Sequence, residues 1–376
     1  MKNMKTKLRL AGILIFFVSI NLFAQENENQ ETRGVQVTFF YPVGSNGTYS
    51  GNITNHLSFN ILVGYAGGLD GVELGGLLNI NRDFVQGVQF SGFGNITGGP
   101  VHGAQLAGFA NFNKGITKGF QAAGFANFTR GYSRAFQGAG FGNFSQDLRG
   151  AQLAGFGNFA SGKVEGAQFA GFGNFATDVN GAQIAGFINV AKHVNGVQLG
   201  VLNVADSVSN GIPIGIFSIV KNGYYELEVT GGEVIYSNLN YKMGVEKFYT
   251  IYKLGYSTYK SNPVYSIGLG FGSNVFTSAK HKISVDLSAN QIVYNNNWDW
   301  DNDLNLLNKV DVNYKYSITE RLSFLVGPSF NVYTTKQKVD GEFGTLNVPY
   351  SLYEDEWSTG KVQMWLGLNA GLSLTL

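Results

Sequence analysis

A ten-residue phrase recurs through the middle of the chain at a spacing of 15 or 16 residues. Residues 150–159 read GAQLAGFGNF and residues 166–175 read GAQFAGFGNF. A fixed period of this size is typical of stacked repeat architectures. We therefore expect a Gly-rich β-repeat array over residues 71–222, with ten units that begin at Gly71, Gly87, Gly103, Gly119, Ala135, Gly150, Gly166, Gly181, Gly196 and Gly211.

Each unit carries amide side chains at fixed positions. In a parallel β-solenoid, identical residues of successive coils stack in register, so amide columns become hydrogen-bonded ladders. One predicted ladder comprises Gln89, Gln105, Gln121, Gln137, Gln152, Gln168, Gln183 and Gln198, with Glu73 at its start. The other comprises Asn79, Asn95, Asn111, Asn127, Asn143, Asn158, Asn174, Asn189 and Asn203. A third column, which we expect to pack as a structural layer, comprises Phe93, Phe109, Phe125, Phe141, Phe156, Phe172 and Phe187.

The repeats are compatible with solenoid coils or with the strands of one large up-and-down barrel. Three observations favour the solenoid. The connections all have about the same length, whereas barrel turns alternate between two environments. The gap from Gln198 to Asn203 is five residues where other units have six, a slip that a corner tolerates better than a strand. An apolar residue suited to a buried corner also precedes most units: Ile116, Tyr132, Leu148, Val164, Val179, Val194 and Val208.

Residues 223–376 show a different pattern, a strict alternation of apolar and polar residues. In VDVNYKYSI, for example, the apolar and aromatic residues from Val310 to Ile318 occupy every second position. This period of two indicates extended strands with one apolar and one polar face. About eight strands fit between residues 224 and 376, each long enough to cross a bilayer. We expect an antiparallel outer-membrane β-barrel whose lumen contains Asp286, Asp311 and Lys315, with a soluble β-domain as the alternative.

The N-terminal region indicates export. Lys2, Lys5, Lys7 and Arg9 precede an apolar run, and Ala24 is a plausible cleavage position, so residues 1–24 are predicted to be a signal peptide. A polar leader is expected at residues 25–34. Two strand-like runs at 35–43 and 56–65 predict an N-terminal β-hairpin or cap over residues 35–70. We therefore expect an exported protein of the outer membrane or cell surface of a Gram-negative bacterium.

Composition narrows the range of functions. The chain has no cysteine, which excludes disulfides and thiolate chemistry. Removing the four cations of the predicted signal peptide takes the formal net charge from +1 to −3, so no basic tract points to nucleic acid. The four histidines lack a second ligand at metal spacing, and Asp299, Asp301 and Asp303 lack the glycine and glutamate of a calcium loop. We assign no catalytic residue, cofactor or metal.

The Gly-x-Gln-x-x-Gly-x-x-Asn repeat resembles that of an uncharacterised family of surface-repeat proteins known from Leptospira and widespread in the Bacteroidota. The stretches GIPIGIFSIVKNGYYELEV (211–229) and LNLLNKVDVNYKYSITERLSF (304–324) are similar to features of that family. The resemblance covers roughly residues 35–376 and implies an exported, envelope-associated protein without an assigned activity. Some members are lipoproteins, from which this chain differs in having no cysteine.

These observations predict a non-enzymatic outer-membrane or cell-surface repeat protein with a structural, adhesive or binding role. Outer-membrane lipid is the expected partner, and the surface ligand is not identified. One alternative is a large outer-membrane pore of about twenty strands, lined by Asp286, Asp311, Lys315 and the amide columns. The other is a soluble, exported, carbohydrate-binding repeat protein, in which exposed aromatic residues would contact sugar.

Overall fold

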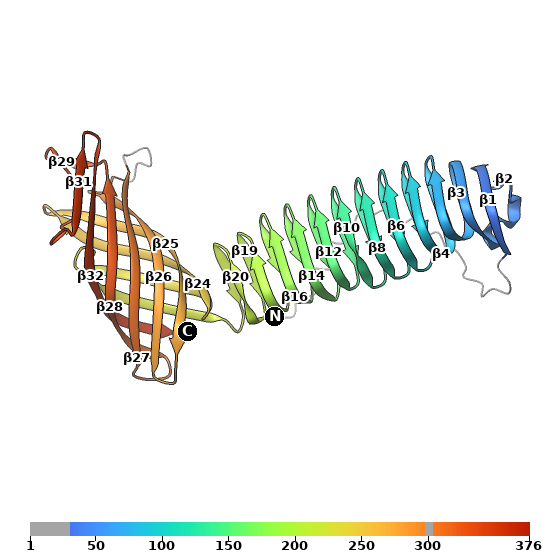
Figure 1. Ribbon diagram of the computed structural model, residues 1–376. Helices are drawn as coiled ribbons and strands as arrows, with labels where there is room; N and C mark the ends of the chain where they lie inside the picture. The colour runs from blue at the N-terminus through green and yellow to red at the C-terminus, as the bar shows by residue number, and fades with distance from the viewer. Residues whose placement is uncertain (1–30, 298–303) are drawn as a thin grey trace.

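The computed structural model describes residues 31–297 and 304–376, which fold into two β-structured parts (Figure 1). The first is a parallel β-solenoid of about 10 turns, and the second is a closed 8-stranded antiparallel barrel. The predicted all-β class, the solenoid and the barrel are thereby confirmed. The predicted signal peptide (1–24) and residues 25–30 of the leader lie outside the described residues, as do Asp299, Asp301 and Asp303.

The first part of the solenoid includes a two-residue strand and a short 3-10 helix. Each later coil consists of one longer and one shorter strand. The elements of the solenoid are β1 (Glu31–Phe40), β2 (Val43–Gly44), η1 (Gly47–Asn52), β3 (Ile53–Gly75), β4 (Leu78–Ser91), β5 (Gly94–Thr97), β6 (Val101–Ala107), β7 (Ala110–Asn113), β8 (Thr117–Ala123), β9 (Ala126–Thr129), β10 (Ser133–Ala139), β11 (Gly142–Ser145), β12 (Leu148–Ala154), β13 (Gly157–Ala160), β14 (Lys163–Ala170), β15 (Gly173–Phe175), β16 (Asp178–Ala185), β17 (Ile188–Val190), β18 (His193–Leu199), β19 (Leu202–Ala205), β20 (Ser207–Ile214) and β21 (Phe217–Val220).

Successive coils pair in parallel, with like residues opposite one another. Gln168 of β14 lies opposite Gln183 of β16, for example. A glycine opens every unit except the one that begins at Ala135, and it permits this close stacking. Gly103 has φ of 138°, and a Cβ atom there would lie 1.9 Å from the carbonyl oxygen of Gly87 in the preceding coil. A side chain at this position is excluded by the backbone angle and by the neighbouring carbonyl.

The N-terminal hairpin expected at residues 35–70 is not formed. β1 pairs in parallel with β3, with Val37 opposite Phe59, so both strands belong to solenoid coils. The chain does reverse tightly after Phe40, but only the two residues of β2 pair antiparallel with β1, and η1 then carries the chain into the next coil. The last residues of the expected leader, 31–34, are likewise part of β1.

The corner prediction also needs a correction. Leu148, Val164, Val179 and Val194 are buried together as expected, but Ile116 is 37% exposed. Three residues, 114–116, separate β7 from β8, whereas two separate β11 from β12. The inward position of that coil therefore falls on the next residue, a buried threonine. Tyr132 is likewise only partly buried, and the serine that follows it takes the inward position opposite Leu148.

The slip between Gln198 and Asn203 is absorbed at a corner, as the sequence predicts. β18 ends at Leu199 and β19 begins at Leu202. Asn203 still lies opposite Asn189 of the preceding coil. The missing residue falls where β18 meets the corner, since Ala185 of β16 has no counterpart in β18, and the register of both strands is intact.

The barrel closes through its first and last strands without help from residues 35–65. Glu226 of β22 lies opposite Thr375 of β32, which completes the ring. β31 (Tyr353–Trp357) extends the last hairpin, and β29 (Lys338–Val339) pairs with β30 (Glu342–Phe343). The eight wall strands are β22 (Tyr224–Gly231), β23 (Ser237–Val245), β24 (Phe248–Tyr259), β25 (Asn262–Thr277), β26 (His281–Tyr294), β27 (Asn305–Ser317), β28 (Leu322–Thr335) and β32 (Gly360–Thr375).

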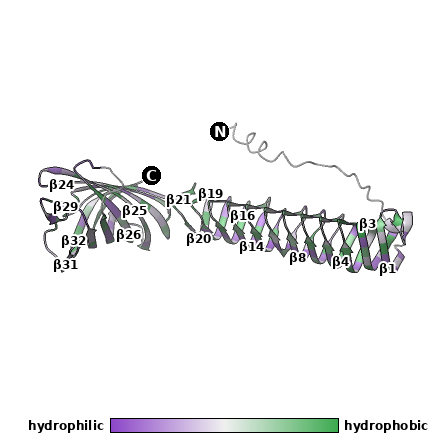
Figure 2. Cartoon of the chain, turned by 90° about the horizontal axis from the view of Figure 1, so that it is seen from above, coloured by the Kyte–Doolittle hydropathy of each residue, from purple (hydrophilic) through white to green (hydrophobic). Residues whose placement is uncertain are grey.

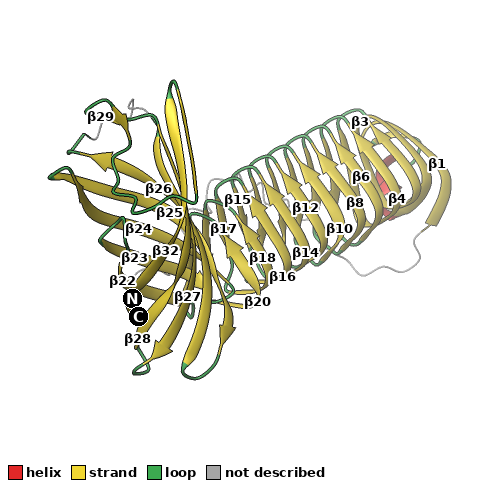
Figure 3. Ribbon diagram, turned by 60° about the vertical axis from the view of Figure 1, so that its left-hand side comes forward, coloured by secondary structure: helices red, strands yellow, loops and turns green. Residues whose placement is uncertain are grey.

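The last solenoid coil rests against the outside of the barrel (Figure 3). The Thr250 hydroxyl of β24 donates to the Gly215 carbonyl at 2.8 Å, and the Tyr252 hydroxyl donates to the Ile216 carbonyl. The rings of Phe217 and Tyr252 stack with centroids 5.9 Å apart. Within residues 31–297 and 304–376, no helix is long and apolar enough to cross a membrane.

Candidate functional site

The glutamine column forms a continuous ladder inside the solenoid. Each Nε2 donates to the Oε1 of the glutamine one coil earlier, at 2.7–2.9 Å, from Gln198 down to Gln105. Gln89 then donates to Oε2 of Glu73 at 2.7 Å. All of these side chains are fully buried. Because buried amides are costly unless they are paired, the ladder is a structural element of the coil interior.

The asparagine column forms a second ladder with the opposite direction. Each Nδ2 donates to the Oδ1 of the next coil at 2.8–3.0 Å. The same Nδ2 also donates to a backbone carbonyl, as Asn111 does to Ala122 at 2.9 Å. The two ladders therefore orient their amide dipoles against each other along the solenoid. Neither column is available to a ligand, since both are enclosed.

Glu73 is the buried acceptor at the N-terminal end of the glutamine ladder. Besides Gln89, its carboxylate oxygens accept from Asn60 at 2.8 Å and from Asn81 at 2.6 Å. Burial raises the pKa of this carboxyl, although the three amide donors act in the opposite direction. Its position explains why an acid stands where later units have glutamine: three amide donors converge on it, and a carboxyl has two oxygen acceptors where an amide has one.

The phenylalanine column lies on the outside, which corrects the prediction of a packed layer. The rings do stack from coil to coil, with centroids 4.8–5.4 Å apart, but each is 38–48% exposed. They occupy the corner between the two strands of each coil, where the side chain of the preceding glycine would meet the neighbouring coil. We call residues 91–97 and their counterparts in later coils the apolar edge. A second stack on this edge comprises Phe112, Phe128, Phe144, Phe159 and Phe175.

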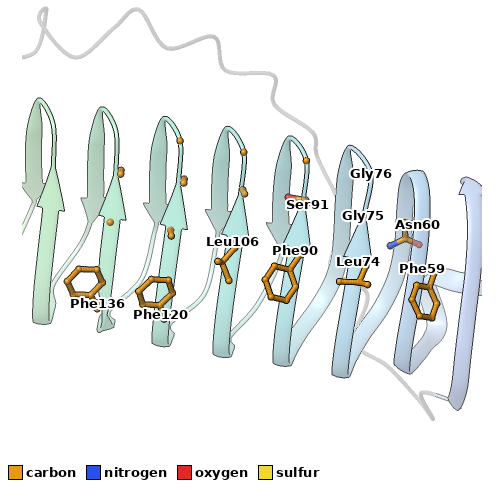
Figure 4. A pocket seen from close by; sticks show the side chains of 18 of the residues that line it. Phe59, Asn60, Leu74, Gly75, Gly76, Phe90, Ser91, Leu106, Phe120 and Phe136 are labelled. Carbon is orange, nitrogen blue, oxygen red and sulfur yellow. The ribbon is translucent and has the colours of Figure 1, made fainter.

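An apolar groove follows one side of this edge, with a volume of about 1000 Å³ (Figure 4). The groove arises because the neighbouring strands β6 and β8 carry their large side chain at different positions. Phe120 lies opposite Ala104, whereas Ala122 lies opposite Leu106, so the wall recedes where the small residues stand. Phe59 and Leu153 lie at the two ends of the groove along the solenoid. Its lining is mostly apolar, with Asn60 and Ser91 as polar side chains and without a charged one.

The apolar edge exposes as much apolar surface as the largest patches of monomeric soluble proteins, which are often functional. With about 200 Å² per phenylalanine side chain, each ring of the corner stack leaves about 80 Å² in contact with solvent. The seven rings together expose on the order of 500 Å², whose removal from water is worth roughly 13 kcal/mol. Contiguous exposed patches of this size mark binding or membrane surfaces.

The opposite edge of the solenoid is charged. The exposed side chains there include Lys114, Lys118, Arg130, Arg134, Arg149 and Lys163. Hydrophobic and hydrophilic positions thus recur coil after coil along the array (Figure 2). The solenoid is amphipathic across its width, with the charged edge and the apolar edge on opposite sides of each coil.

The barrel interior holds an ion-pair network that includes the three residues predicted for the lumen. Lys242 pairs with Asp286 at 2.7 Å and with Glu228 at 2.8 Å. Lys315 pairs with Glu226 and Glu228. Asp311 pairs with Lys309 of its own strand and, across the interior, with Lys253 of β24. All eight members are inside the wall: Glu226, Glu228, Lys242, Lys253, Asp286, Lys309, Asp311 and Lys315.

An apolar cluster fills the other half of the interior. Trp365, Tyr333, Leu307 and Leu346 pack together there, with Leu346 coming from the loop that follows β30. The space left within the ion-pair network is only about 10 Å³, at most room for one water molecule. Because the repeats form a solenoid and the barrel has eight strands, the alternative of one barrel of about twenty strands lined by the amide columns is wrong.

Metal-ligating side chains do not converge in the described part of the chain. His281 contacts the Tyr314 hydroxyl at 2.6 Å and His193 contacts the Ser207 hydroxyl at 2.9 Å, both at the surface. Within residues 31–297 and 304–376, no group of three His, Asp or Glu side chains could hold a metal ion. The surface with the strongest functional signal is therefore the apolar edge.

Comparison with protein-family models, with curated proteins and with solved structures found no match to this chain. The family resemblance seen in the repeat and in residues 211–229 and 304–324 therefore remains an expectation from the sequence.

Proposed function

We propose that this chain is a non-enzymatic outer-membrane repeat protein, in which the barrel is a closed membrane anchor and the solenoid provides a structural or binding surface. The observation that carries the proposal is the polarity of the barrel. Its charged residues are paired inside the wall, and its outer face is apolar on every side, with exposed Leu254, Leu269, Leu287, Phe324, Leu368 and Leu372. A soluble barrel would present the reverse arrangement to water.

Aromatic residues at one rim support a membrane position. Tyr314 and Tyr316 face outward near the short turn 318–321, and each is 40% exposed. Tyrosine is enriched where a membrane protein crosses from hydrocarbon to head groups. Charged residues such as Lys247 and Arg321 lie just beyond, in the turns 246–247 and 318–321.

The lengths of the connections support an orientation. The turns 246–247, 278–280 and 318–321, which lie at the end where the solenoid joins, are all short. The long connections that follow β26 and β28 lie at the other end, together with the short turns 232–236 and 260–261. Outer-membrane barrels have short periplasmic turns and longer extracellular loops. The proposal therefore places the solenoid on the periplasmic side and the long connections at the cell surface.

The carbohydrate-binding alternative receives less support. Sugars stack on the faces of aromatic rings. In the corner stack, neighbouring rings cover each other's faces at 4.8–5.4 Å, which leaves mainly ring edges exposed.

Two measurements on the full chain purified in detergent test the proposal. A closed outer-membrane barrel resists unfolding by detergent, so the unheated protein should migrate faster on a gel than the boiled protein. Because the interior is filled, the folded protein should leave a planar bilayer electrically silent. Identical migration with and without heating, together with solubility without detergent, would overturn the anchor. Regular single-channel steps would overturn its closed state.

A further inference from the structure

We infer that the solenoid lies edge-on in the inner leaflet of the membrane that holds the barrel, with its apolar edge among the lipid acyl chains and its charged edge in the periplasm. This inference rests on the proposed function, because it uses the membrane position of the barrel. It assigns a partner, bilayer lipid, to the apolar edge and the groove beside it.

The attachment point sets the height of the apolar edge against the barrel wall. The last corner, Gly215–Ile216, contacts Thr250 and Tyr252 on the outer face of β24. These residues lie two and four positions beyond the start of that strand, about 7 and 14 Å from the rim along the strand. The corner thus meets the wall within the apolar belt of the barrel, at a depth typical of interfacial elements.

The charged edge lies nearer the rim. Where the solenoid leads into the barrel, the amide of Asn222 donates to the carbonyl of Asp206 in the coil before, and β22 begins at Tyr224. In Figure 1, strands β6, β8 and β10 run upward, so the corner after each of them points to the side on which β29 and β31 lie. The apolar edge therefore faces the bilayer and the charged edge faces away from it.

The backbone of the apolar edge is suited to hydrocarbon because its polar groups pair within the solenoid. At one corner the amide of Phe125 donates to the carbonyl of Phe109 at 2.8 Å, and the amide of Gly124 donates to the carbonyl of Ala107 at 3.2 Å. The buried Asn111 side chain donates a hydrogen bond to the carbonyl of Ala122. Irregular backbone is excluded from lipid when such groups lack partners, and here coil-to-coil pairing supplies them.

Charge is absent from the whole length of the edge. The corner segments 91–97, 107–113, 123–129, 139–145, 154–160, 170–176 and 185–191 contain no Asp, Glu, Lys or Arg. A protein partner would be matched by a bounded patch with a polar rim. An uninterrupted apolar edge along the array, continuous with the apolar wall of the barrel, matches a bilayer instead. The groove along Phe120 and Leu106 would be filled by acyl chains.

Single cysteines test this directly, since the natural chain contains none. An environment-sensitive fluorophore is attached to Phe125→Cys or Phe156→Cys on the apolar edge, and to Lys118→Cys on the charged edge. Leu287→Cys on the outer wall of the barrel reports insertion. Each full-length protein is folded into phosphatidylcholine vesicles that carry a spin-label quencher on the acyl chains, and iodide is used as the aqueous quencher.

The inference predicts that the fluorophores at positions 125 and 156 are quenched by the acyl-chain label to an extent similar to position 287 and are shielded from iodide. Position 118 should show the reverse. Quenching at position 287 with iodide access at 125 and 156 would overturn the inference while leaving the anchor intact. Loss of lipid quenching at position 287 as well would count against the anchor itself. Two edge variants guard against a single substitution that disturbs its coil.

Discussion

Nε2 of Gln89 lies 2.7 Å from Oε2 of Glu73, and this contact ends a ladder of buried amides that starts at Gln198. At the other end, Oε1 of Gln198 has no hydrogen-bond partner, because a proline lies opposite it in the next coil. The ladder therefore has a donor end that meets a carboxyl and an acceptor end near the barrel. The two ends of the ladder thus differ from its repeating middle, with a carboxyl acceptor at one end and an unpaired amide oxygen at the other.

Glu73 should make the stability of the solenoid depend on pH. Its pKa is raised in the folded protein by burial, so the folded state retains a proton that the unfolded chain has lost. The contribution of this group is present below the ordinary carboxyl pKa and is lost as pH rises from there to the raised value. In Glu73→Gln this dependence disappears, so the melting temperature of the variant should improve relative to the natural protein as pH rises through that window. Thermal unfolding at several pH values measures the difference.

The control for this prediction is Glu165→Gln on the charged edge. There Lys163 lowers the pKa of an exposed carboxyl, so the trend with pH should be weak and opposite in sign. A parallel pH dependence in the natural protein and Glu73→Gln would contradict the assignment.

Each asparagine of the ladder should contribute measurably to the stability of the solenoid. In Asn127→Ala, the Oδ1 of Asn143 and the carbonyl of Gly138 lose the donor that they share. A buried group left without its partner costs about 1–3 kcal/mol, so the urea midpoint of the solenoid should fall clearly. Lys118→Ala, at an exposed position, should leave the midpoint nearly unchanged. Equal midpoints for the two variants would show that the ladder is dispensable.

The glycine before each exposed ring should tolerate no side chain. A Cβ at Gly108 would lie 2.0 Å from the carbonyl oxygen of Gly92, whereas one at Gly34 would meet nothing within 4 Å. Gly108→Ala should therefore lower the melting temperature of the solenoid, and Gly34→Ala should not. Circular dichroism during heating provides the comparison, and an unaffected Gly108→Ala would contradict the observed coil spacing.

The barrel should depend on its interior ion pairs. Lys242→Met removes the cation between Asp286 and Glu228 and leaves two carboxylates without it. Breaking a buried pair from one side costs about 3–5 kcal/mol. The fraction of heat-modifiable, folded barrel should therefore fall at lower urea concentration in Lys242→Met than in the natural protein. Lys247→Met in an exposed turn provides the matched control, and indistinguishable curves would mean that the network adds little.

Periodicity predicted most of the fold because it fixes which residues share a column. The amide ladders, the eight C-terminal strands and the interior positions of Asp286, Asp311 and Lys315 all followed from repeat spacing or alternation. Alternation could also have identified Glu226 and Glu228, which share the polar face of their strand, but their lysine partners come from other strands and needed the closed barrel.

The position of the phenylalanines could not be predicted in the same way. The period places Phe109 in a column with Phe125, but it does not say whether a corner side chain points inward or outward. The direction is set by the tight corner that Gly108 permits and by Asn111, which fills the interior beside it. Likewise, the parallel pairing of residues 35–40 with β3 depends on η1, which carries no periodic signal.

The orientation of the barrel in the membrane is the central claim, and single-cysteine labelling in intact cells tests it most directly. Glu342→Cys lies on β30 among the long connections, and Lys118→Cys lies on the charged edge of the solenoid. With a membrane-impermeant maleimide, the account predicts labelling of position 342 in intact cells and labelling of position 118 only after the outer membrane is permeabilised. Labelling of position 118 in intact cells, with position 342 protected, would contradict it.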